Sequence, residues 1–164
     1  MADLTKLESK LGEVTGLAMA AKAATTKVQR LAAEEHEDLV GMLEEMSAQA
    51  AETEERCTDL AGTFDGKKTA ILEEARSTKN KAASMLDIYL DDDSDALDGF
   101  EFLTMAEAGE VGHWEVLGQM AKSAGRIDVN DLVGWALPIQ QQHFDAARST
   151  AAKLAASEDP DEEE

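Results

Sequence analysis

Residues 106–125 read AEAGEVGHWEVLGQMAKSAG, and they belong to the clearest helical pattern in the chain. The apolar positions in and just before this stretch fall on one side of a helix: Leu103, Val111, Trp114, Leu117 and Ala121. Gly125 follows where a helix is expected to end. The pattern predicts a helix over residues 95–124.

The same periodicity predicts four further helices on either side of this one. Two precede it at the start of the chain, over residues 4–21 and residues 28–61, the second ending before Gly62. A shorter one is expected over residues 71–89, and a last long one over residues 129–156. The chain therefore reads as five helices in succession.

Two long helices, a shorter one and two more long ones match an antiparallel four-helix bundle with an extra connecting helix. Aromatic residues make up only 4% of the chain and there are 2 prolines, so helix formers outweigh strand formers. We predict an all-α fold in which residues 1–157 form one bundle. The acidic residues 158–164 are predicted to be a disordered tail.

The chain is strongly acidic, with 35 Asp and Glu against 15 Lys and Arg, and its formal charge is −20. Nucleic acids and anionic membranes are therefore not expected as partners, whereas metal cations are. A single cysteine, Cys57, excludes an internal disulfide and a thiolate zinc cluster. We find no signal-peptide pattern and no apolar run long enough for a membrane span, and we expect a cytoplasmic protein.

Several polar residues interrupt the apolar stripes, where an unpaired carboxylate costs several kcal/mol to bury. On the second predicted helix Glu35 falls between apolar positions, with His36 and Asp38 beside it. On the next long helix, Glu107 and the Glu110-x-x-His113 pair lie at helical spacing, and Gln140 and His143 repeat the i, i+3 spacing on the last helix. These polar positions are the candidates for a metal site in the core.

The helix order and three stretches resemble the ferritin-like superfamily, in particular its YciF-type branch of stress-associated bacterial proteins. The stretches are EEHEDL at 34–39, AEAGEVGHWEVLGQMAKSAG at 106–125 and QQQHFDAA at 140–147. The order of His113, Trp114 and Glu115 is similar to the family's histidine, aromatic and glutamate. The resemblance covers nearly the whole chain.

This resemblance implies a bundle whose centre holds iron, as a di-iron or mononuclear site, with iron oxidation or sequestration as the activity and a homodimer as the assembly. The ligands that it implies in this chain are Glu35, Glu107, Glu110, His113 and His143, with weaker candidates at His36, Asp38 and Gln140. Three glutamines, 140–142, stand where the family usually places glutamates. Fewer carboxylates favour zinc over iron(III).

Two other readings compete with a ferritin-like metal site. A metal-free helical module that dimerises through its bundle explains the three glutamines better, and it requires no enzyme activity. The acidic run at residues 91–98 resembles a calcium loop in charge alone, because it lacks the glycine and the glutamate that such a loop requires. We expect that run to cap the helix that follows it. Trp114 and Trp135 are expected to fill the core.

Overall fold

The computed structural model describes residues 2–162, and all regular structure in this range is helical. Five long helices are joined by short connections, and one turn of 3-10 helix precedes the second of them. Their bounds are Lys6–Ala32 (α1), Glu37–Leu39 (η1), Val40–Ala61 (α2), Lys68–Tyr89 (α3), Ala96–Ala124 (α4) and Ile127–Ala155 (α5). The predicted all-α class is confirmed.

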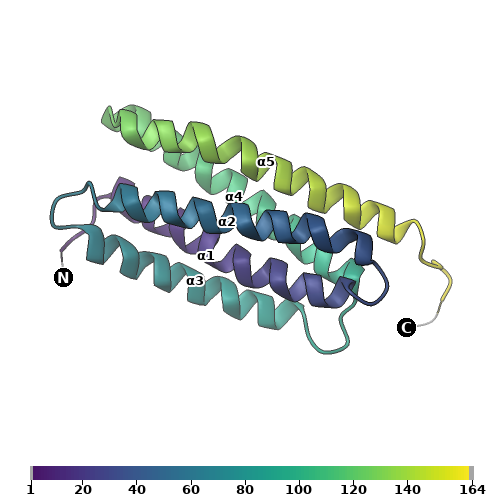
Figure 1. The fold of residues 1–164 in the computed structure, drawn as a ribbon. Helices are drawn as coiled ribbons and strands as arrows, with labels where there is room; N and C mark the ends of the chain where they lie inside the picture. Colours follow the sequence, from purple (N-terminus) through teal and green to yellow (C-terminus); the bar gives the residue numbers. More distant parts are fainter. Residues whose placement is uncertain (1, 163–164) are drawn as a thin grey trace.

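The five helices lie roughly parallel to one long axis, and each runs opposite to the one before it (Figure 1). α1 packs against α2, α3 and α4, whereas α5 packs mainly against α4 and makes a smaller contact with α2. α3 therefore lies on the outer side of α1. Because α3 spans the length of the bundle between α2 and α4, those two helices run in the same direction (Figure 1).

Local sequence explains where the helices begin and end. Thr5 caps α1 in a capping box with Glu8, and Asp95 caps α4 in a capping box with Asp98. Gly125 ends α4 in the left-handed conformation at φ 66°, which a residue without a side chain adopts at little cost. The predicted cap in the acidic run before α4 is confirmed.

The boundary between the first two helices differs from the prediction. α1 continues to Ala32 and therefore includes Val28, which we assigned to the second helix, and α2 begins only at Val40. Residues 22–32 contain no glycine or proline and extend α1 without a break. The chain turns instead at residues 33–39, where four acidic side chains in five residues repel one another.

α1 and α3 approach each other closely because two glycines of α1 face α3. A Cβ added at Gly16 would lie 2.3 Å from the backbone oxygen of Ala75, and one added at Gly12 would lie 2.8 Å from that of Ile71. Any larger side chain at either position would push the helices apart. The glycines that weaken α1 as an isolated helix thus position α3 against it.

The apolar core consists of two clusters that lie along the bundle. One contains Leu11, Ile71, Trp114 and residues near the α4–α5 turn. The other contains Val28, Leu43, Phe100, Leu103 and residues toward the end of α5. The helices that supply the first cluster also supply the second, from different turns. Trp114 is buried as predicted, whereas Trp135 is only partly buried. Between the two clusters the helices carry buried polar side chains.

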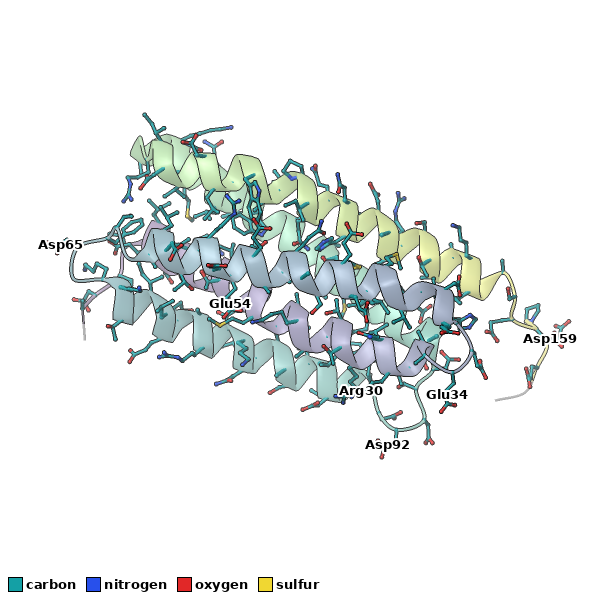
Figure 2. The ribbon with its side chains drawn as sticks, in the orientation of Figure 1. Arg30, Glu34, Glu54, Asp65, Asp92 and Asp159 are labelled. Atoms are coloured by element: carbon teal, nitrogen blue, oxygen red, sulfur yellow. The ribbon has the colours of Figure 1, made fainter. Side chains whose placement is uncertain are left out.

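Charged side chains project from the surface, the connections and the tail, as Glu34, Asp65, Asp92 and Asp159 show (Figure 2). α5 ends at Ala155, close to the predicted end of the bundle, and the last two residues of the predicted tail, 163–164, lie outside the described residues. Within residues 2–162, no helix is both long and apolar enough to cross a membrane.

Candidate functional site

A layer of polar side chains separates the two apolar clusters near the middle of the bundle. α4 contributes Glu107 and Glu110, which are 1% and 5% exposed. α5 contributes Gln140 and His143, both buried, and α2 contributes the half-buried Gln49. Four of these five residues were predicted from the sequence: Glu107, Gln140 and His143 are in direct contact, and Glu110 lies one turn from Glu107 on α4.

Glu107 is the centre of this layer. The Nε2 amide of Gln140 donates a hydrogen bond to Oε2 of Glu107, and Nδ1 of His143 lies 3.6 Å from the same oxygen. Residues 140 and 143 lie one turn apart on α5, so their side chains reach α4 together. A single amide hydrogen bond leaves most of the hydrogen-bonding capacity of the Glu107 carboxylate unused.

The far side of the His143 ring is held by α2. Nε2 of His143 lies 2.6 Å from Oε1 of Gln49, to which it donates a hydrogen bond. In the neutral imidazole, that bond places the only ring proton on Nε2 and leaves a lone pair on Nδ1. Two acceptors, Nδ1 of His143 and Oε2 of Glu107, then face each other, and their lone pairs repel. A cation or a proton between the two atoms would remove this repulsion.

Glu110 has no hydrogen-bond or ion-pair partner for its carboxylate within residues 2–162. Burial raises the pKa of Glu110 well above its usual value, and the neighbouring charge of Glu107 raises this pKa further. Two buried carboxylates next to each other are costly unless a cation or a proton compensates their charge. The site is therefore a place of concentrated negative charge inside an apolar bundle.

His113 does not join this layer, although it lies three residues after Glu110 on α4. Its Nδ1 lies 3.3 Å from Oε2 of Glu13 and 3.3 Å from Nζ of Lys10, both on α1, and its side chain is 41% exposed. Three residues turn a helix by about 300°, which carries His113 from the core to its edge. Glu110 and His113 line one cavity on the same side of α4, as predicted, but the His113 ring is held by α1 and lies outside the polar layer.

The remaining predicted ligands lie at the end of the bundle. Glu35, His36 and Asp38 belong to the connection between α1 and α2, and Glu35 and Asp38 are exposed. The prediction that Glu35 lies on an inward helical stripe is wrong because the helix on which it was placed is interrupted there. These three side chains are separated from the polar layer by the apolar cluster around Leu43 and Phe100.

Sequence reasoning missed Gln49 and the proximity of Cys57. Gln49 lies three residues after Met46 and four before Thr53, both buried, so its position on the inward face was a usable signal. Cys57 is fully buried, and its thiol interacts with Thr15 on α1 and lies near Glu54 and Glu110. Burial raises the pKa of Cys57 to about 12.

The donor set of the polar layer is two carboxylates, one imidazole nitrogen and two side-chain amides. Oxygen and imidazole donors suit divalent first-row metals, and the Nε2–H bond from His143 to a carbonyl oxygen is the usual support of a metal-binding histidine. Within residues 2–162, His, Cys, Asp and Glu side chains form no group of three already drawn together around one point. Amide oxygens or water would have to complete the coordination.

No protein-family model matches the chain, and comparisons with curated proteins and with solved structures give no match either.

Proposed function

We propose that the polar layer binds one divalent cation through Glu107, Glu110 and His143. The observation that carries this proposal is the short distance of 3.6 Å between Oε2 of Glu107 and Nδ1 of His143, beside a second buried carboxylate. A divalent ion would balance the two carboxylates and accept the imidazole lone pair. Gln140 would supply an amide oxygen if its side chain rotated away from its hydrogen bond to Glu107.

The helix arrangement supports a ferritin-like origin for this site. α1 and α2 form one antiparallel pair and α4 and α5 form another, with α3 as the long crossover between them (Figure 1). Such a crossover characterises ferritin-like bundles, in which side chains on facing helices hold the metal. The stress-associated role that the resemblance implies and the cytoplasmic location expected from the sequence are part of this proposal.

The positions of the ligands favour a mononuclear site over a di-iron site. A ferritin-like di-iron centre takes a glutamate from each of two helices and a Glu-x-x-His pair from each of the other two. Here Glu35 and His113 lie elsewhere, and α2 places Gln49 rather than a carboxylate in the layer. We therefore propose iron(II) or zinc as the ion. Glu107, Glu110 and His143 would hold the ion, and bound iron(II) would give up its electron to oxygen or peroxide on oxidation.

Metal binding can be tested by isothermal titration of metal-free protein with iron(II), under anaerobic conditions, and with zinc. We expect one ion per chain for wild type and a loss of affinity of at least about tenfold for His143→Ala and for Glu107→Gln. His113→Ala is the matched control, because that histidine lies outside the layer. Circular dichroism of each variant separates lost binding from lost folding.

The outcomes distinguish the proposal from its rivals. Two ions per chain, with affinity lost in His113→Ala, would restore the di-iron prediction. Equal and weak binding by wild type and His143→Ala, with no change of melting temperature on chelation, would overturn the metal proposal. A native-state metal must raise the melting temperature, since it binds the folded chain alone.

The alternative function is a metal-free module that assembles through its surface, with a homodimer as the first expectation. Exposed apolar side chains near the end of α3 favour it: Ile88 is 78% exposed and Tyr89 is 57% exposed. Sedimentation of wild type and of an Ile88→Ser, Tyr89→Ser double variant tests this reading. A dimer that dissociates in the double variant and forms equally without metal would support it.

A further inference from the structure

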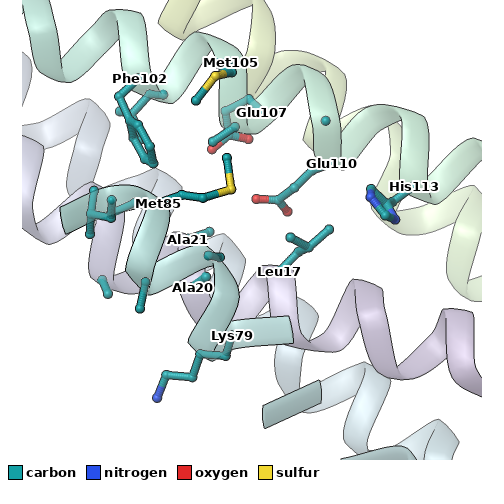
Figure 3. A pocket seen from close by; sticks show the side chains of 18 residues that line it. Leu17, Ala20, Ala21, Lys79, Met85, Phe102, Met105, Glu107, Glu110 and His113 are labelled. Carbon is teal, nitrogen blue, oxygen red and sulfur yellow. The ribbon is translucent and has the colours of Figure 1, made fainter. Parts of the chain in front are cut away.

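A narrow cavity opens onto the carboxylates of the polar layer from the side of the bundle opposite α5. α1 forms its floor, and α3 and α4 form its walls (Figure 3). Its volume is about 180 Å³, and its lining is almost entirely apolar and includes Leu17, Ala20, Met85, Phe102 and Met105. An apolar cavity of about 150 Å³ is large enough for benzene.

The inner end of this cavity carries charge rather than an apolar cap. Glu107, Glu110 and Met85 all line it, and the Glu110 carboxylate points into it (Figure 3). Glu110 is 5% exposed, and no side chain within residues 2–162 is paired with it. A buried carboxylate without a partner, at the end of an apolar cavity, has an uncompensated charge that a cationic ligand would balance.

The basic groups near the cavity do not supply that cation. The side chain of Lys79 is exposed and extends away from the cavity (Figure 3). His113, which follows Glu110 by one turn of α4, is engaged with Glu13 and Lys10 on α1. The Glu110 carboxylate is therefore available to pair with the cationic group of a ligand.

We infer that this cavity binds a small organic ammonium ion, with an unbranched alkyl or phenylalkyl tail among the apolar side chains and the ammonium group on Glu110. The tail gains by leaving water, because each buried methylene contributes to binding. The ammonium group gains a charge-assisted hydrogen bond to a buried carboxylate. The formal charge of −20 would also raise the local concentration of such cations around the protein.

This inference does not depend on metal binding, although a metal and an ammonium ion would compete for Glu110. His143 lines the polar layer but not the cavity, so the two sites respond to different substitutions. His143→Ala should lose metal and keep the ammonium ligand. Changes on the α3 side of the cavity should do the reverse.

Titration calorimetry with hexylamine near pH 7.5, in the presence of EDTA, tests the inference. Methylamine and hexan-1-ol serve as probes that lack the tail and the charge. We expect hexylamine to bind at least about tenfold more tightly than either probe, and Glu110→Gln to remove that preference. Glu115→Gln, an exposed change on the same helix, is the matched control and should bind as wild type does.

A second variant keeps the test informative if Glu110→Gln alters packing. Met85 is 46% exposed, so its replacement should be tolerated, and Met85→Lys would place an ammonium group of the chain itself in the cavity that Glu110 lines. We expect that variant to lose hexylamine binding and to melt at a higher temperature than wild type. Hexan-1-ol binding as tightly as hexylamine, no binding of hexylamine at all, or unchanged binding in both variants would overturn the inference.

Discussion

Oε2 of Glu107 lies 3.6 Å from Nδ1 of His143 and accepts a hydrogen bond from Gln140, so one buried carboxylate links α4 to two consecutive turns of α5. The same histidine reaches α2 through Gln49. Three helices are thereby joined by polar contacts in a layer where apolar packing is interrupted. The layer is both the candidate site and a part of the core, and each role predicts a different response to substitution.

Loss of the Gln140 amide should destabilise the fold. Gln140→Leu removes the donor to Glu107 and leaves a buried carboxylate with less compensation, so we expect unfolding in urea to become easier by about 1–3 kcal/mol. Gln141→Leu, at the exposed neighbouring position, should change stability by less than about 0.5 kcal/mol. Equal effects of the two changes would show that the hydrogen bond contributes nothing.

The stability of the metal-free protein should decrease as the pH rises, because of Glu110. Its pKa is raised in the folded state, so the folded chain binds more protons than the unfolded chain between the two pKa values. The contribution of Glu110 to the free energy of unfolding is fully present below the usual glutamate pKa. It is lost as the pH rises through the pKa of Glu110 in the folded state. Each unit of pH in that window removes up to roughly 1 kcal/mol.

Glu110→Gln should remove this dependence. We expect the variant to melt above wild type near pH 8 and to approach it near pH 4, where Glu110 is neutral in both states. Thermal melts in EDTA at several pH values measure the difference, and Glu115→Gln is again the control. A variant less stable than wild type across the whole range would contradict the assignment of Glu110 as an uncompensated acid.

The sequence predicted the parts of the fold in which local signals and packing agree. α4 follows a long apolar stripe, a capping aspartate and a closing glycine, and its observed bounds match. Glu107, Glu110 and His143 were found because polar residues on an apolar stripe are costly and therefore conspicuous. Helix periodicity alone was sufficient for these residues.

Periodicity failed where a stripe passes through a turn. Val28 and Glu35 continue the spacing of α2 in sequence, yet α1 ends at Ala32 and the chain reverses over residues 33–39, and nothing in the apolar pattern marks that reversal. Periodicity could not place His113 for a related reason. Residues at i and i+3 on a helix can lie on either side of the border between the core face and its edge. The side on which His113 lies is set by the neighbouring helix α1, whose Lys10 and Glu13 contact its ring.

Cys57 should be inert in the folded protein. It is 0% exposed and its pKa is raised to about 12, so almost no thiolate is present at pH 8. We expect a thiol-specific disulfide reagent to label the native chain only at the rate of unfolding and to label it at once in guanidinium chloride. Rapid native labelling would mean that the α1–α2 contact around Thr15 opens readily.

Two glycine substitutions should act in opposite directions. A Cβ at Gly16 would lie 2.3 Å from the Ala75 backbone oxygen and 2.7 Å from Cβ of Thr78, so Gly16→Ala must push α3 away from α1 and should cost about 1–3 kcal/mol. Gly112, inside α4, has no such neighbour within 4 Å, and Gly112→Ala should stabilise the chain by about 0.5–1 kcal/mol.

Urea denaturation of both variants measures these effects, and hexylamine titration adds a second readout. α3 forms one wall of the apolar cavity, so its displacement in Gly16→Ala should also weaken hexylamine binding, whereas Gly112→Ala should leave it unchanged. If Gly16→Ala were as stable as wild type, α3 would be loosely attached. The cavity between α3 and α4 would then lack the rigid wall that recognition of a small ligand requires.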